Sequence, residues 1–210
     1  MDGRKLQDRL YRGFGHSARH VGRSADAFRP KGPFDPLHKQ NRFLRLPAVF
    51  SSAKGGNFDR TNAYGDPLWR GIFDASYTKP GDYLVLDDKT FFIASQMPLL
   101  PVLCVMTNRL ISVARPNVQT NTAINAYGGY ISGNSIPLLG NWPASVLANS
   151  RSTSSKVDLP TDMAVPYWSL LMPCIQGVTL SAGDLITDDL GRTAYSGTLA
   201  GVRISGVHFG

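Results

Sequence analysis

Glutamate is missing from this chain, because all fifteen acidic residues among its 210 residues are aspartate. Glutamate favours exposed helix surfaces, so its absence disfavours a fold with many surface helices and favours a body of strands and turns. Cysteine is scarce as well: only Cys104 and Cys174 occur, both in apolar surroundings. Two cysteines are too few for a disulfide framework or a cysteine-based metal centre, and we expect both to be reduced and buried.

Long apolar runs are absent too. No stretch approaches the roughly 20 residues that a membrane-spanning helix needs, and the charged N-terminus MDGRKLQDRLYRGF is not followed by an apolar segment. We therefore expect no membrane anchor and no signal peptide. With 42% hydrophobic residues, the chain can still bury a core for one large or two small domains.

The positive charge is concentrated near the N-terminus. Residues 1–45 carry eleven Lys and Arg against four Asp, whereas residues 46–210 carry eleven of each sign. Leu6, Leu10 and Phe14 recur at helical spacing, so the segment begins with a short helix. Prolines and glycines between Gly22 and Pro47 then predict extended structure.

Apolar side chains recur along this basic segment, which indicates an arm that lies on a surface. That surface is either the body of the same chain or another subunit, and the length and charge of the arm favour the second. The expected subunit-interface residues are Leu6, Leu10, Phe14, Phe28, Arg29, Phe34, Leu37 and Phe43.

After the arm, the sequence reads as short strands joined by turns. Segments such as YLVL and TFFIA, with Asp87-Asp88 between them, predict a hairpin. We expect a mainly β protein with two tandem small β-barrel or sandwich units behind a helical and extended arm. The expected segments are a basic arm at 1–47, a first β-domain at 48–116, a loop-rich connection at 117–160 and a second β-domain at 161–210.

One pattern occurs twice. GDYLVLDD at Gly81–Asp88 is echoed by GDLITDD at Gly183–Asp189, and each is preceded by a proline and a tryptophan, at Trp69 and Trp168. The shared order is Pro-x-Trp, Gly-Asp, an apolar strand, an Asp-Asp pair and an aromatic residue. A Gly-Asp step followed by a hairpin is one way to open a small antiparallel barrel, so we interpret the echo as one structural unit built twice.

The stretch KPGDYLVLDDKTFFIASQMPLLPVLCVMTNRLISVARP resembles, in this order of elements, the small β-barrel proteins in the neck and tail of tailed bacteriophages. VTLSAGDLITDDLGRTAYSG is similar again, and FRPKGPFDPL resembles the arms with which such subunits hold their neighbours. The resemblance covers roughly residues 28–116 and 166–207. It implies a virion structural subunit, a head-tail connector or fibre-anchoring adaptor, assembled in the host cytoplasm as a homo-oligomer ring. Its expected partners are portal, neck or tail subunits and fibres, with incidental DNA contact and no membrane.

Signals for an enzyme or a cofactor are weak. GFGHSA at residues 13–18 loosely fits a dinucleotide fingerprint but follows a basic helix instead of a buried strand. His16, His20 and His38 have no cysteine near them, and the Asp pairs are expected to cap hairpins and not to bind a metal. We expect no enzymatic activity, no cofactor, no metal and no catalytic residues.

Two alternatives for the function remain open. A basic arm with interleaved aromatic residues is typical of nucleic-acid binding, and a small barrel can provide a stacking platform. The candidate basic contacts are Arg4, Lys5, Arg9, Arg12, Arg19 and Arg23. The second alternative is a carbohydrate-binding receptor module that uses exposed aromatic residues: Trp69, Trp142, Tyr127 and Tyr130.

Overall fold

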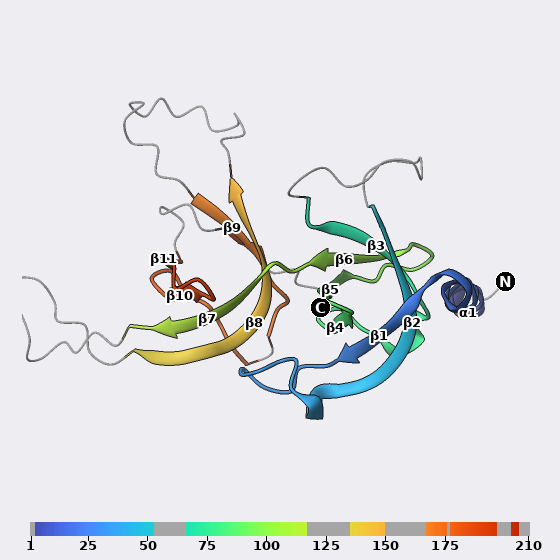
Figure 1. Cartoon of the computed structure of the whole chain (residues 1–210), viewed down its shortest axis with the longest axis horizontal. Helices are drawn as coiled ribbons and strands as arrows, with labels where there is room; N and C mark the ends of the chain where they lie inside the picture. The colour runs from blue at the N-terminus through green and yellow to red at the C-terminus, as the bar shows by residue number, and fades with distance from the viewer. Residues whose placement is uncertain are drawn as a thin grey trace, which may run out of the picture.

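The structure is a computed structural model of the whole chain, and the fold is mainly β. It describes residues 3–52, 66–116, 135–149, 167–175, 177–196 and 203–205. The single helix of this part, α1 (Gly3–Val21), stands at one end of the long axis, and the strands form two groups along that axis (Figure 1).

The first group of strands forms a closed barrel. Six strands follow one another around it in the order β1-β2-β3-β6-β5-β4. All their pairings are antiparallel, which leaves no free sheet edge. The strands are β1 (Arg23–Phe28), β2 (Arg42–Ser52), β3 (Leu68–Ile72), β4 (Tyr83–Leu86), β5 (Lys89–Ser95) and β6 (Val102–Met106), with short 3-10 helices η1 (Lys39–Asn41) and η2 (Ala75–Tyr77) between them.

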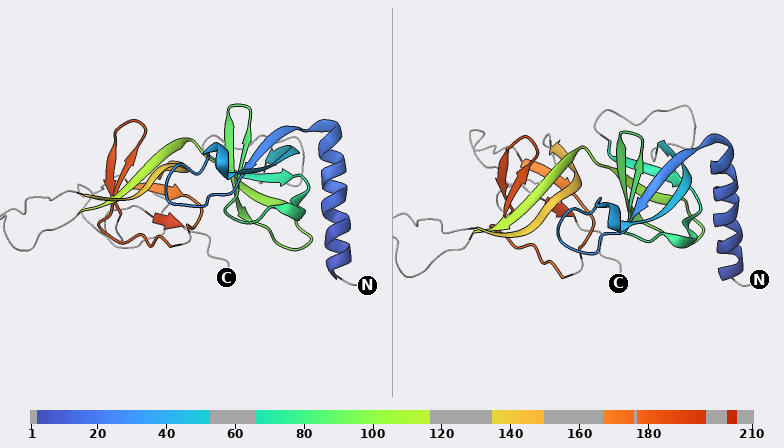
Figure 2. Two further views of the ribbon diagram at one scale, coloured as in Figure 1. Left: turned by 90° about the horizontal axis from the view of Figure 1, so that it is seen from below. Right: turned by 60° about the horizontal axis from the view of Figure 1, so that its bottom comes forward.

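The second group forms a six-stranded sheet in the order β11-β10-β7-β8-β9-β12. Starting from β5, the strand order around the barrel is β5-β4-β1-β2-β3-β6. Each strand of the sheet therefore has a barrel counterpart at the same position in the order. The hairpins β4–β5 and β10–β11 project to the same side of the molecule (Figure 2). The strands are β7 (Arg109–Arg115), β8 (Ile136–Asn149), β9 (Tyr167–Leu171), β10 (Leu185–Asp188), β11 (Thr193–Tyr195) and β12 (Arg203–Ser205).

The two groups differ where the barrel closes. In the barrel, β6 pairs antiparallel with both β3 and β5. In the sheet, β12 pairs parallel with β9, and the described residues contain no ladder between β12 and β11. Within the described residues, the second group is therefore not closed by strand pairing at the position where the first group is.

A shared apolar core joins the two groups. Tyr83 from β4 is fully buried, packs edge-on against Trp142 from β8 with ring centroids 6.0 Å apart, and donates its hydroxyl hydrogen to the Pro143 carbonyl at 2.9 Å. Burial raises the pKa of the Tyr83 hydroxyl well above its usual value, so this donor stays protonated. The same core includes Phe92 of the barrel and Leu139 of the sheet.

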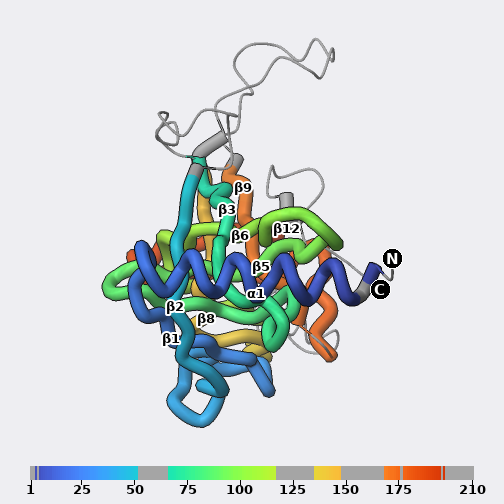
Figure 3. The backbone as a smooth tube through the Cα atoms, turned by 90° about the vertical axis from the view of Figure 1, so that its right-hand side faces the viewer, coloured from blue at the N-terminus to red at the C-terminus, as the bar shows by residue number. Residues whose placement is uncertain are grey.

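Helix α1 lies across the barrel wall formed by β2 and β3 (Figure 3). Tyr11, Gly15 and Ala18 recur at helical spacing and are buried against the wall, while Lys5 and Arg12 on the opposite side are exposed. The expected N-terminal helix is thus present, extends further than the leucine pattern indicated, and packs on its own chain.

The expected arm boundary at residue 47 falls inside β2 and is wrong. Strand β1 pairs with both β2 and β4, so the barrel begins at Arg23 and not at residue 48. The inward residues of β1 are Ala25 and Ala27, whose small side chains fit beneath their neighbours but give no obvious strand pattern in the sequence.

The turn between β1 and β2 also lies on its own chain. The Pro33 carbonyl accepts a hydrogen bond from Trp142 Nε1 at 2.6 Å, and Phe34 forms a parallel bridge with Gly140 of β8. This segment therefore docks on the second sheet of its own chain, and its predicted contact with another subunit stays a prediction. The expected loop-rich connection at 117–160 contains the long strand β8, while 117–134 and 150–160 lie outside the described residues.

Two glycines of α1 offer a matched test of helix docking. A Cβ at Gly15 would lie 2.8 Å from Asp74 Cβ, whereas a Cβ at Gly13 would meet no described atom within 4 Å. Alanine favours a helix by up to about 1 kcal/mol over glycine. We expect Gly13→Ala to slow trypsin cleavage after Arg12 and Arg19 and to raise the melting temperature, and Gly15→Ala to speed cleavage. Equal protection in both variants would contradict this packing.

Candidate functional site

The first Gly-Asp step forms the turn that leads into β4. Gly81 has a φ of 93°, a left-handed conformation that glycine adopts without strain. Asp82 is 1% exposed, and its carboxylate accepts hydrogen bonds from Arg29 Nε at 2.8 Å, Arg29 Nη2 at 2.7 Å and the Lys79 N–H at 2.9 Å. Arg29 Nη2 also donates to the Tyr77 carbonyl at 3.0 Å. A buried carboxylate thus fixes the turn to the end of β1.

The second Gly-Asp step repeats this arrangement. Gly183 has a φ of 91°, and Asp184 is 1% exposed. The Asp184 carboxylate accepts from Arg115 Nε at 2.7 Å, Arg115 Nη2 at 3.0 Å and the Ser181 N–H at 2.7 Å. Arg115 Nη2 donates to the Thr179 carbonyl at 2.9 Å, as Arg29 does to Tyr77. Both arginines are followed by proline, in FRP and ARP, a signal that was present in the sequence.

The backbone around the two aspartates matches as well. Gly81 N–H donates to the Ile93 carbonyl, and Ile93 N–H returns a hydrogen bond to the Asp82 carbonyl. Gly183 N–H donates to the Ser196 carbonyl, and Ser196 N–H returns one to Asp184. The reciprocal pairs place each hairpin's second strand directly beside its Gly-Asp step.

A second ion pair recurs at the opposite end of the same strands. Arg23 Nη1 at the start of β1 lies 2.7 Å from Asp87 Oδ2 in the β4–β5 turn. Arg109 Nε at the start of β7 lies 3.9 Å from Asp189 Oδ1 in the β10–β11 turn. Both pairs are exposed or half exposed, so they report geometry more than they contribute stability.

The pairing of β1 with β4 and the pairing of β7 with β10 agree residue by residue around these ion pairs. Phe28 lies opposite Tyr83, and Ala114 lies opposite Leu185. Phe28 and Ala114 each directly precede the arginine that holds the buried aspartate. The β1–β2 pairing shifts once, at Ala27/Phe28, whereas the β7–β8 pairing shifts twice, at Ile111/Val113 and at Val113/Ala114. Because a one-residue slip would reverse every side chain, the agreement of the β1–β4 and β7–β10 ladders indicates that β4 and β10 have equivalent inward faces.

The two tryptophans that precede the Gly-Asp steps take matching positions. Trp69 on β3 pairs with Ser52 of β2, and Trp168 on β9 pairs with Ala148 of β8. Counting back from these pairs along β2 and β8 leads to the matched pairs Ala25–Leu46 and Ile111–Trp142. In each sheet the tryptophan-bearing strand stands three places from the first strand of the hairpin, β3 from β4 and β9 from β10.

Charge stabilises the ionised form of the buried second carboxylate. The hydrogen bonds from the Arg115 guanidinium lower the pKa of Asp184, against the opposing effect of burial, and the Ser181 N–H lowers it further. The carboxylates in turn raise the pKa of Arg29 and of Arg115 through the same hydrogen bonds. The lowered pKa of Asp184 keeps its bidentate contact with Arg115 charged over the physiological pH range.

The residues expected at a subunit interface do not form one surface. Phe28 is buried in the core and Arg29 holds Asp82, while Leu37 packs against the core and Phe34 against Gly140. Phe43 is 38% exposed, with the Arg29 guanidinium 4.4 Å from its ring centroid. On α1, Leu6 is 40% exposed and Leu10 and Phe14 are half-buried.

The expected basic contacts come together more closely. Lys5, Arg9, Arg12 and Arg19 are exposed and recur at intervals of three, four and seven residues, which places them along the side of α1 away from the barrel. Arg23 is held by Asp87 in β1, and the side chain of Arg4 lies outside the described set. We name Lys5, Arg9, Arg12 and Arg19 the basic stripe.

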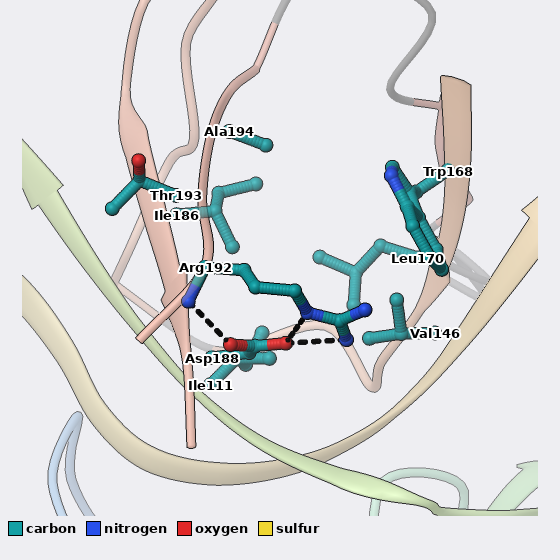
Figure 4. Close-up of a pocket in the computed structure, with 9 residues that line it drawn as sticks. All are labelled: Ile111, Val146, Trp168, Leu170, Ile186, Asp188, Arg192, Thr193 and Ala194. Carbon is teal, nitrogen blue, oxygen red and sulfur yellow. Dashed lines mark hydrogen bonds and ion pairs between the residues drawn. The ribbon is translucent and has the colours of Figure 1, made fainter. Parts of the chain in front are cut away.

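A pocket of about 70 Å³ opens on the inner face of the second sheet (Figure 4). Arg192 reaches across it: its guanidinium carbon lies 4.7 Å from the Trp168 ring centroid, while its Nη2 lies 2.6 Å from Asp188 Oδ2. Arg192 also lowers the pKa of Asp188, which keeps this pair charged although burial opposes it. The remaining wall is mostly apolar, formed by Ile111, Val146, Leu170, Ile186, Thr193 and Ala194.

The same region of the barrel is filled by aromatic rings. By strand register, Phe50 and Phe91 of the barrel correspond to Val146 and Ala194 of the pocket. Phe50 and Phe91 stack with centroids 3.8 Å apart, and Trp69 packs edge-on against Phe91. The smaller side chains in the second sheet leave the pocket where the barrel has a closed core.

Other candidate chemistry finds little support in the described residues. They contain no group of three or more His, Cys, Asp or Glu side chains that could hold a metal ion, and no helix long and apolar enough to cross a membrane. Cys104 is buried with a strongly raised thiol pKa, but Cys174 is exposed, so the expectation of two buried cysteines is wrong for Cys174. Trp142 is 1% exposed and Trp69 half-buried, which makes both core residues, while Tyr127 and Tyr130 lie outside the described residues.

Removal of one buried carboxylate should reveal how much the fold depends on it. A buried ion pair that loses one partner typically costs roughly 3–5 kcal/mol, and Arg29 is one-third exposed, so we expect Asp82→Asn to lower the free energy of unfolding by about 2–3 kcal/mol. The control is Asp88→Asn in the exposed hairpin turn, with an effect below about 0.5 kcal/mol. Equal urea midpoints for both variants would exclude a structural role for the Arg29–Asp82 pair.

The second pair predicts a dependence of stability on pH. Because the pKa of Asp184 is lowered on folding, its contribution is fully present above the unfolded-state pKa of about 3.9 and is lost as pH falls through the lower folded-state pKa. We expect the urea midpoint to fall less steeply below pH 5 in Arg115→Gln than in the wild-type chain. Arg70→Gln, at an exposed position on β3, should keep the wild-type slope.

Comparison with models of protein families, with curated proteins and with solved structures finds no match to this chain.

Proposed function

We propose that this chain is a structural subunit of a bacteriophage virion, placed at the head-tail neck or in the tail as a connector or a fibre-anchoring adaptor. It acts by assembling into a symmetric oligomer and catalyses no reaction. The proposal rests on the sequence resemblance to small β-barrel neck and tail proteins, to which the geometry adds support.

The observation that carries the proposal is the repeated scaffold. We infer that the barrel and the second sheet are one unit built twice, because strand order, Gly-Asp turn, buried Arg–Asp pair and tryptophan position all agree. The buried carboxylates of the repeated turns and their arginines bind one another, and these contacts hold the hairpins in place. A rigid scaffold whose buried charges are internally satisfied suits a subunit that presents surfaces to neighbours.

The rival function is binding of nucleic acid through the basic stripe. A row of cations on one solvent-facing side of a helix is the arrangement that tracks a phosphate backbone. The stripe has four members, however, and the other arginines described around the barrel are largely paired with aspartates. We therefore place nucleic-acid binding second, as an accessory contact within a particle.

Two measurements separate these two functions: the copy number of the protein in purified particles, and the salt dependence of its affinity for DNA. We expect purified particles made with the wild-type chain to contain it in a fixed copy number after nuclease treatment and a high-salt wash. Lys5→Ser, Arg9→Ser and Arg12→Ser together should leave that copy number unchanged. The matched control removes three exposed cations elsewhere: Lys39→Ser, Arg70→Ser and Lys89→Ser.

Fluorescence anisotropy with a duplex DNA probe tests the rival directly. Four phosphate contacts predict a roughly hundredfold loss of affinity between 50 and 200 mM salt, abolished by the stripe variant and kept by the control. Such a result, together with particles that lack the protein, would reverse the ranking of the two functions. Absence from particles alone would overturn the proposed function.

A further inference from the structure

Two apolar features lie at opposite ends of the long axis of the molecule. One is the β5–β6 turn, where Met97, Leu99 and Leu100 are 50%, 47% and 53% exposed. The other is the pocket lined by Trp168 and Ala194 in the second sheet. The turn lies beside α1, and the pocket lies in the sheet at the far end (Figure 1).

Leu99 is unfavourable in two ways: its backbone conformation is strained, and its apolar side chain is about half exposed. Its φ is 62°, in the left-handed region that glycine and asparagine normally occupy. Such strain persists where the surrounding structure imposes it, and it clusters at sites that bind something. A half-exposed leucine in this conformation is unfavourable for the isolated chain, and binding through its side chain would explain it.

The turn is held firmly in place. The Leu99 N–H donates to Gln7 Oε1 on α1. Gln96 Nε2 donates to the Ala75 carbonyl at 2.8 Å and to the Tyr11 hydroxyl oxygen at 3.2 Å. These contacts anchor the turn to α1 and η2, so Leu99 and Leu100 are presented with little conformational entropy left to lose on binding.

The pocket is a mostly apolar space that an entering side chain can use. Its volume of about 70 Å³ exceeds what one water molecule needs. The barrel fills the equivalent place with its own Phe91, whereas the second sheet has only Ala194 there. Trp168 remains 36% exposed at the rim, so this ring is within reach of an approaching side chain.

We propose that a second copy of this chain occupies the pocket: Leu99 of one copy enters the pocket of the next copy, with Leu100 at its rim. This rests on the proposed function, since it names the contact through which the subunits assemble. Donor and acceptor are different surfaces at opposite ends of one chain, so the contact is heterologous and repeats head to tail, closing into a ring when the rotation between copies permits.

Two substitutions test the contact without weakening the fold. Leu99→Gly removes the side chain and relieves the left-handed strain, and Ala194→Phe fills the pocket with the residue that the barrel uses. We expect each to weaken self-association at least tenfold by analytical ultracentrifugation, with a melting temperature equal to or above that of the wild-type chain. The matched control is Leu110→Ala, an exposed leucine of β7, which should associate normally.

A crosslink between copies identifies the surfaces in contact. Two preparations carry Leu99→Cys or Thr193→Cys, both with Cys174→Ser, and are mixed with a short bis-maleimide. We expect a covalent dimer in the mixture, and its loss when Ala194→Phe is added to the Thr193→Cys chain. Thr193 is chosen because it is exposed at the pocket rim.

The outcomes distinguish this inference from the proposed function. A monomeric wild-type chain, or association and crosslinks that neither Leu99→Gly nor Ala194→Phe reduces, would overturn the head-to-tail contact. If Leu99→Gly enters particles at the normal copy number, the contact is wrong and the virion function stands. If the crosslink forms as expected but particles lack the protein, the contact stands and the virion function is wrong.

Discussion

A buried aspartate carboxylate at the start of a hairpin is the constraint on which the rest of the structure depends. Asp82 and Asp184 are almost fully removed from solvent, which is tolerable only because an arginine and a backbone N–H satisfy each carboxylate. The arginine stands at the end of a neighbouring strand. One ion pair therefore sets the direction of the hairpin, the register of that strand and the closure of the Gly-Asp turn together.

Glycine before each aspartate follows from the same constraint. The turn must reverse tightly for the carboxylate to face inward, and φ values of 93° and 91° are accessible to glycine at low cost. The residues just before the glycines differ, as Pro80 and Ala182 do, because the turns are closed by hydrogen bonds from Asp82 N–H to the Lys79 carbonyl and from Asp184 N–H to the Ser181 carbonyl. This explains why a two-residue signal was recognisable across a hundred residues while the flanking sequence diverged.

The sequence was informative where a local pattern determines structure and uninformative where a distant partner does. The hairpins and the mainly β class followed from turn chemistry and alternation. Arg29 and Arg115 could not be assigned to Asp82 and Asp184, which lie 53 and 69 residues away in the chain. The FRP and ARP triplets were the signal available, but a triplet becomes meaningful only once its partner is known.

Two errors have a common physical origin. Strand β1 was read as part of an arm because Ala25 and Ala27 are small, and small residues are needed where a strand is crowded on both sides. Strand β8 was read as a loop because it contains Pro137, Gly140 and Pro143, which its irregular pairing with β7 accommodates. Intrinsic strand propensity gave the wrong prediction for both strands because tertiary packing outweighed it.

Differences between the barrel and the second sheet separate stability from the recognition that we propose. The barrel is closed and filled with stacked rings, so it can carry the strain of Leu99 and the docked helix without losing its shape. The second sheet has the same framework with smaller side chains, and it retains an apolar pocket. The basic stripe adds long-range electrostatic attraction at the end of the molecule that carries the β5–β6 turn. Charge accelerates encounter and weakens with salt, whereas an apolar side chain in a pocket determines how long the contact lasts. A subunit with both can find its position quickly and hold it after salt has screened the charges.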